Sequence, residues 1–116
     1  AGTLLEEARY VTRAEFMTFL GRVVGAKVDH TLKPEFTDVS IDGWSTGYIA
    51  WGLENGLIQG YGDGRFGPKD TLTQEHVNLI IERFANKFDR EVVGFDGPAG
   101  DATRGQVAVI LASLLD

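Results

Sequence analysis

Apolar residues return at helical spacing in three stretches of the chain, and each stretch follows a threonine. The threonines are Thr12, Thr73 and Thr103, and the fourth, seventh, eighth and eleventh residues after each one are apolar. These positions hold Phe16, Phe19, Leu20, Val23, Val77, Ile80, Ile81, Phe84, Val107, Ile110, Leu111 and Leu114. Because this spacing puts four side chains of a copy on one helical face, the sequence predicts three amphipathic helices related by an internal repeat.

The residues after each threonine are typical of a helix start. Glu15 and Gln106 stand three residues after the first and third threonines, which is the capping-box pattern. In this pattern the threonine oxygen accepts from a first-turn amide, and the longer side chain accepts from the threonine amide. After Thr73 the same place holds His76, so only the simple cap is expected there. The predicted helices span residues 13–24, 73–88 and 103–116.

A fourth helix is predicted at residues 43–55, where Trp44, Tyr48, Ile49, Trp51 and Leu53 give an apolar side. Glycines inside it cost about 1 kcal/mol each relative to alanine, so we expect close packing against a neighbouring backbone. Gly25 and Gly56 are natural stops after the first and fourth helices.

The connections between these helices are rich in glycine. Residues 57–68 are expected to form a hairpin-like piece with Asp63 and Gly64 at its tip. In the connection before the fourth helix, Phe36 and Val39 are expected to enter the core, and Asp38 to brace a turn.

Together these elements predict a single all-α domain over residues 1–116. The third threonine follows the second more closely than the second follows the first, and no counterpart of the Trp44 helix fits between them. The chain is therefore divided into a partial repeat at 1–25, a complete repeat at 26–88 and a truncated repeat at 89–116.

The composition of the chain argues against several classes of function. The net charge of −6 argues against nucleic acid as the main partner, because phosphate contacts need a basic face. The chain has no cysteine, and no stretch approaches the ~20 apolar residues of a membrane span. His30 and His76 lie on different elements without an evident carboxylate partner, so neither a metal site nor a catalytic base is expected. Ala1 in place of methionine is typical of a processed or excised fragment.

One longer pattern carries a family resemblance. It runs Phe36-x-Asp38-Val39, then Trp44-x3-Tyr48-Ile49, then residues 56–68 (GLIQGYGDGRFGP), then Leu72-Thr73-x-Glu75. This stretch resembles one repeat of the S-layer homology (SLH) family. Residues 11–15 (VTRAE) are similar to that family's TRAE signature, and residues 102–106 (ATRGQ) look like a worn copy of it.

The resemblance implies an all-helical module with the TRAE-type helices around a pseudo-threefold axis. It implies a bacterial cell-surface protein that is anchored without covalent bonds to a secondary cell-wall polysaccharide, commonly one with ketal-linked pyruvate. Binding would lie in grooves between repeats, with the TRAE arginine meeting the acidic group. Residue by residue, the expected ligand contacts are Arg13, Thr12, Glu15, Trp44, Arg104, Tyr61 and Gly60.

Considered from the residues alone, several of these positions also have explanations that involve no ligand. A cation at a helix start opposes the helix dipole, so Arg13 and Arg104 would gain from an anion bound across the free first-turn amides. Otherwise each arginine is solvated or pairs with a nearby glutamate. Trp44 could stack on a sugar or pack at the core boundary, and Trp51 competes for the exposed role. Gln74 replaces the arginine in the second copy, which puts a second groove in doubt.

The leading hypothesis is a non-catalytic module, without cofactors, that anchors a protein outside the cell to an acidic wall polysaccharide. Its groove is expected between the start of the first helix and the Trp44 helix, with Arg13 facing outward. The alternative is a protein–protein interaction module, in which a homodimer completes the bundle.

Overall fold

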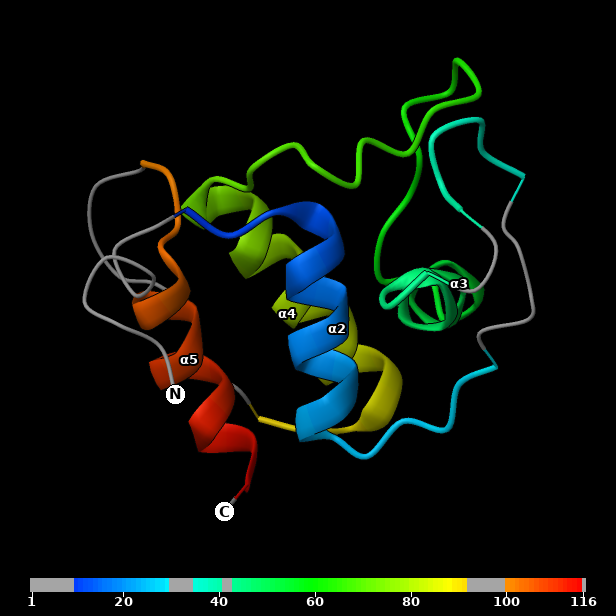
Figure 1. Cartoon of the computed structure of the whole chain (residues 1–116). Coiled ribbons are helices and arrows are strands. Elements are labelled where there is room, and N and C mark those ends of the chain that lie inside the picture. The colour runs from blue at the N-terminus through cyan, green and yellow to red at the C-terminus, as the bar shows by residue number, and fades with distance from the viewer. Residues whose placement is uncertain (1–9, 30–34, 41–42, 92–99, 116) are drawn as a thin grey trace.

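The computed structural model describes residues 10–29, 35–40, 43–91 and 100–115. Its regular elements are helices α2 (Arg13–Val23), α3 (Thr46–Glu54), α4 (Gln74–Phe88) and α5 (Arg104–Ala112), followed by the short 3-10 turn η1 (Ser113–Leu115). In the described ranges, extended backbone pairs only in isolated bridges. The predicted all-α fold is therefore confirmed, and α2 lies between α3 and α5 (Figure 1).

The three threonine-led helices start from a closed ring of backbone hydrogen bonds. Val11 donates to the Ala102 carbonyl at 2.9 Å, Ala102 donates to Leu72 at 3.0 Å, and Leu72 donates back to Val11 at 3.0 Å. Each of these residues directly precedes a capping threonine and is buried. The ring gives the helix starts the pseudo-threefold arrangement that the resemblance implies.

The helix caps follow the sequence closely. Thr12 and Thr103 form capping boxes with Glu15 and Gln106, whereas Thr73 accepts only from the His76 amide. At the far end of α2, Gly25 adopts a positive φ of 70° and ends the helix. Ten of the twelve predicted core positions are buried, and the other two, Phe19 and Val23, are half-buried against the core.

Helix α3 begins at Thr46, three residues later than predicted from the sequence. Residues 43–45 form a turn in which Thr46 N donates to the Gly43 carbonyl at 3.2 Å. The Thr46 hydroxyl is held by the Ser40 carbonyl at 2.6 Å, and Ser45, the N-cap residue, makes no side-chain cap. Local hydrogen bonding therefore delays the helix, although the apolar pattern begins earlier.

Close packing between α2 and α3 explains why α3 contains glycine despite its cost in a helix. A Cβ atom at Gly52 would lie 2.5 Å from Met17 Sδ, which is too close for a real contact. Reciprocally, Gly21 in α2 leaves room for the Tyr48 ring of α3. This interlocking packs α3 directly against α2.

The loop at residues 57–68 packs on the helices through Leu57, Ile58 and Phe66, all buried. Its tip is hairpin-like as predicted, since Tyr61 N donates to the Arg65 carbonyl at 3.0 Å. Val39 is buried and Phe36 is partly buried against the core, as expected. The first and third predicted repeats contain residues 1–9 and 92–99, which lie outside the described residues. In the described part of the chain, no helix has the length and apolar character needed to cross a membrane.

Candidate functional site

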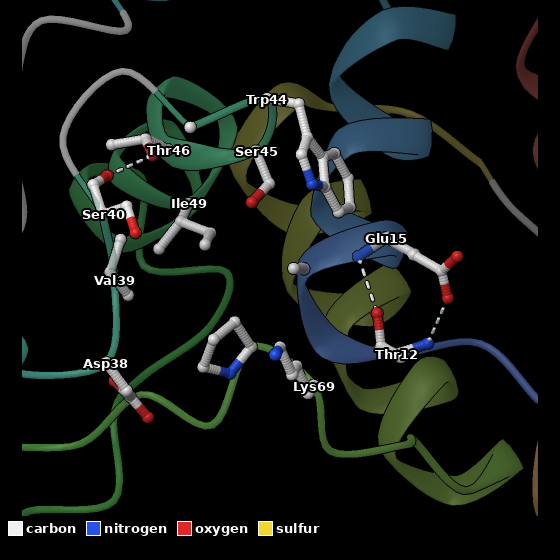
Figure 2. Close-up of a pocket in the computed structure, with 13 residues that line it drawn as sticks. Thr12, Glu15, Asp38, Val39, Ser40, Trp44, Ser45, Thr46, Ile49 and Lys69 are labelled. Carbon is white, nitrogen blue, oxygen red and sulfur yellow. Dashed lines mark hydrogen bonds between the residues drawn. The ribbon is translucent and has the colours of Figure 1, made fainter.

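A pocket of about 350 Å³ opens between the starts of α2 and α3 (Figure 2). We call it the α2–α3 groove. Helix α2 and its cap form one wall, the turn before α3 forms another, and the segment before α4 forms the floor. The lining residues are Thr12, Ala14, Glu15, Asp38, Val39, Ser40, Gly43, Trp44, Ser45, Thr46, Ile49, Pro68 and Lys69. The groove therefore lies where the sequence analysis expected one.

Trp44 is the prominent side chain of the α2–α3 groove. Its side chain is 60% exposed, and its indole hangs over the groove beside the α2 start (Figure 2). Trp51, the competing candidate, instead stacks on Phe88 with ring centroids 6.3 Å apart and packs against the core. Of these two tryptophans, Trp44 is the one that can offer its face to a ligand.

Beside Trp44, the Ser45 side chain has a hydroxyl without a hydrogen-bond partner among the described residues. Ser45 is only 9% exposed, and its oxygen points into the α2–α3 groove (Figure 2). An unpaired hydroxyl next to an exposed aromatic ring suits a ligand that has both apolar faces and hydroxyl groups.

The start of α2 does not offer free amides, contrary to the expectation from the sequence. The Arg13 amide donates to the Asp70 carbonyl at 2.8 Å, and the Ala14 amide to the Pro68 carbonyl at 3.1 Å. The Glu15 amide donates to Thr12 Oγ1 at 3.1 Å. With these donors satisfied by the protein, anion binding across this helix start has no amide support.

Arg13 is not the outward-facing group that the sequence predicted. Its Nε donates to the Phe66 carbonyl at 3.0 Å, and its Nη2 donates to the Gln59 carbonyl. The guanidinium carbon lies 4.6 Å from the Phe66 ring centroid and 4.8 Å from that of Tyr61. Arg13 thus clamps the loop at residues 57–68 to α2, and it does not line the α2–α3 groove.

Burial of the Arg13 side chain lowers its pKa, although the neighbouring Tyr61, Asp70 and Asp38 act in the opposite direction. An arginine remains charged even so. The clamp could not be predicted from the sequence, because its partners are backbone carbonyls far along the chain that no local pattern indicates.

Arg104 pairs with a glutamate, which is one of the alternatives open at the sequence level. Its Nε lies 3.9 Å from Glu15 Oε2, and its guanidinium carbon lies 5.2 Å from the Phe19 ring centroid. Glu15 is buried and also accepts from the Thr12 amide at 2.9 Å. Glu15 therefore links the α2 cap to α5, and Arg104 does not line the α2–α3 groove.

Gly60 and Tyr61 likewise lie outside the residues that line the groove. The Tyr61 hydroxyl donates to Asp70 Oδ2 at 2.7 Å, and its ring covers Arg13. A Cβ atom at Gly60 would collide with the Phe36 ring. Of the seven expected ligand contacts, the structure brings Thr12, Glu15 and Trp44 to the α2–α3 groove.

Asp38 lines the groove and braces the loop at residues 57–68, not a turn in its own connection as the sequence suggested. Its two carboxylate oxygens accept from the Phe66 and Gly67 amides, each at 2.9 Å. Burial raises the pKa of this carboxyl. The hydrogen bonds from those two amides and the charge of Arg65 together lower it by more, so the pKa lies below its usual value.

The sequence analysis did not select Ser45 or Lys69 as site residues. Lys69 follows Pro68 in the segment before α4, and Ser45 follows Trp44. Adjacency to residues of the family pattern was the only signal available for either. Among the described residues, no group of three or more histidine, cysteine or acidic side chains is placed to hold a metal ion.

The segment that forms two sides of this groove has counterparts in known proteins. Residues 35–77 match the S-layer homology domain. This segment is an SLH domain. The family resemblance inferred from the sequence is thereby confirmed for the stretch that carries Asp38, Trp44, Ser45 and Lys69.

Several known proteins match this chain over a small part of their own, much longer sequences. A cell surface protein of Thermoanaerobacter kivui is 38% identical over 77 residues, which are 63% of this chain and 10% of that protein. An amylopullulanase of Thermoanaerobacterium thermosulfurigenes is 35% identical over 81 residues, 70% of this chain and 4% of that protein. A cellulosome-anchoring protein of Acetivibrio thermocellus is 26% identical over 98 residues, 82% of this chain and 22% of that protein. The names of the first and third relatives agree with the expected cell-surface localisation.

Replacing Arg13 with lysine should lower the free energy of unfolding by about 1–3 kcal/mol. A lysine cannot present the planar fork that reaches two carbonyls while stacking on two rings, so a partly buried carbonyl loses its donor. Urea unfolding followed by tryptophan fluorescence measures the change.

Arg104→Lys is the matched control, because it changes the same residue type at the equivalent position of the repeat. Its contact with Glu15 is long, so a loss below about 1 kcal/mol is expected. Equal losses for the two variants would contradict the clamp.

The Asp38 brace should make stability depend on pH. Because the folded-state pKa is lowered, the contribution of the carboxylate is present above the unfolded pKa of about 3.9 and is lost as pH falls through the folded value. Asp38→Asn removes this contribution, so the Tm difference between wild type and variant should shrink as pH falls below about 4. Calorimetry over that range measures it, and a difference that stays constant would refute the assignment.

Proposed function

We propose that this chain is a non-catalytic anchoring module that holds a larger protein to a bacterial cell-wall polysaccharide through the α2–α3 groove. The observation that carries the proposal is the exposed Trp44 ring beside the Ser45 hydroxyl, which has no hydrogen-bond partner among the described residues. Both residues lie within the SLH segment. The cell-surface and anchoring names of the relatives support the same role.

The chemistry of the groove suits a sugar ring. A pyranose has an apolar face of C–H groups and a rim of hydroxyls, so it can lie against an indole while its rim reaches polar groups. Here the Ser45 hydroxyl offers a donor and an acceptor, and the buried Ile49 and Val39 side chains give the groove an apolar lining.

The polysaccharide that we propose is acidic, with a pyruvyl ketal as the expected acidic group. The parent proteins of the relatives include an amylopullulanase, but the match covers only 4% of that protein. Anchoring, and not the activity that this relative is named for, is therefore the role that we assign to the module.

Truncating Trp44 should release the module from the wall. Trp44→Ala is expected to weaken retention on purified cell-wall sacculi by about tenfold, or ~1.4 kcal/mol, because the ring platform is lost. Retention is measured by co-sedimentation before and after the secondary polysaccharide is stripped from the sacculi.

Tyr10→Ala provides the control, since Tyr10 is an exposed aromatic residue that does not line the groove. It should leave retention unchanged. Equal retention of wild-type protein on intact and stripped sacculi would refute the polysaccharide as ligand, and an unchanged Trp44→Ala variant would refute the groove.

A second candidate function is an interaction module that pairs with another chain. Aligned on the threonines, Ala108 and Ala112 of α5 correspond to Met17 and Gly21, the α2 positions that pack against α3. Both alanines are exposed, and Val109 beside them is 75% exposed. The α5 face thus resembles a helix-packing surface that is open to solvent.

If α5 pairs with a second copy, light scattering should give a mass that rises from monomer to dimer with concentration. Val109→Glu would then keep the protein monomeric, because a charge at the contact is costly to bury. A wild-type protein that stays monomeric at every concentration, yet is retained by sacculi, would reject pairing as a requirement.

A further inference from the structure

Lys69 is the cation of the α2–α3 groove. It is the one lysine or arginine among the thirteen lining residues. Its side chain is exposed, and no ion pair or hydrogen bond joins it to another described residue. The clamp residue Arg13, which the family resemblance would assign to an acidic group, is committed to the Phe66 and Gln59 carbonyls.

The carboxylates near the groove are engaged elsewhere. Asp38 accepts from two backbone amides, and Glu15 accepts from the Thr12 amide while facing Arg104. Asp70, the neighbour of Lys69 along the chain, accepts from the Tyr61 hydroxyl. The positive charge of Lys69 is therefore not taken up by a direct partner among these groups.

The position of Lys69 is fixed by its backbone. The carbonyls on either side, of Pro68 and Asp70, accept from the Ala14 and Arg13 amides of α2. This pairing holds residue 69 against the first turn of α2, on the floor of the groove and opposite Trp44 (Figure 2). Only the side chain of Lys69 is free to adjust to a ligand.

We propose that the Lys69 ammonium group binds the anionic substituent of the wall polysaccharide, while Trp44 and Ser45 hold its sugar ring. The inference rests on the proposed function and adds the residue that binds the acidic group of the polysaccharide. A chain of net charge −6 repels an anionic polymer as a whole, so a local cation is needed where the two meet. The anionic substituent that would pair with Lys69 is a carboxylate or a phosphate on the glycan.

The test uses purified secondary cell-wall polysaccharide in three forms: untreated, carboxyl-reduced, and dephosphorylated with hydrofluoric acid. Affinities for the full chain are measured by calorimetry at low and at high salt. The variants are Lys69→Met, Lys69→Arg, and Lys87→Met as the control. Lys87 lies in the last turn of α4 and is not among the residues that line the groove.

Lys69→Met should weaken binding of untreated polysaccharide roughly three- to fivefold, the size of an exposed charge contact, and should reduce its salt dependence. Lys69→Arg should retain most of the affinity, and Lys87→Met all of it. On the treated form that lacks the relevant anion, wild type and Lys69→Met should bind equally. If carboxyl reduction removes the difference, the anion is a carboxylate; if dephosphorylation does, it is a phosphate.

Two results would overturn the inference, and they are distinguishable from failure of the proposed function. If Lys69→Met binds untreated polysaccharide as tightly as wild type, Lys69 has no such role, although anchoring through the groove stands. If Lys87→Met weakens binding as much as Lys69→Met, the effect is one of net charge. If the wild type binds no form of the polysaccharide, the proposed function and the inference both fail.

Discussion

A ring of three backbone hydrogen bonds determines how this small helical module is organised. Val11, Leu72 and Ala102 each donate to one neighbour and accept from the other, just before their capping threonines. Buried backbone groups must be paired, and here each pair also aligns two helix starts. Three helices with apolar faces then converge from one end, and their side chains form a single core.

The α2–α3 groove is a consequence of the same arrangement. Next to the ring, the Arg13 amide bonds to Asp70 and the Ala14 amide bonds to Pro68, so the segment before α4 lies against the first turn of α2. The same register recurs where Gln74 bonds to Gly100. These bonds satisfy amides that would otherwise be free to bind an anion.

Sequence reasoning recovered the features that depend on local periodicity and local chemistry. The apolar spacing predicted α2, α4 and α5, and the threonine caps predicted where they begin. It placed α3 correctly but started it too early, because the Ser40 carbonyl captures the Thr46 hydroxyl in a way that no spacing rule contains. Asp38 was expected to brace a turn, but its partners, the Phe66 and Gly67 amides, lie far along the chain, where no local pattern could indicate them.

The side-chain roles at the site were harder to predict. Arg13 was expected to face outward because its position at a helix start favours a bound anion, but the helix start alone does not reveal the carbonyls of Gln59 and Phe66. Those partners are brought to it by the folded loop. Lys69 was overlooked for the opposite reason: a lysine after a proline has no pattern of its own, and only the packing of its backbone on α2 brings it into the groove.

The ring also constrains the order in which the chain can fold. Its last bond joins Val11, near one end of the sequence, to Ala102, near the other. Closing so long a loop costs chain entropy, and the contacts that form earlier between residues close in sequence do not offset this cost. On a ribosome, the first two threonine-led helices would emerge and pack while the Val11 amide and the Leu72 carbonyl still lacked partners. The segment that carries Ala102 therefore closes the ring after the first two threonine-led helices have formed.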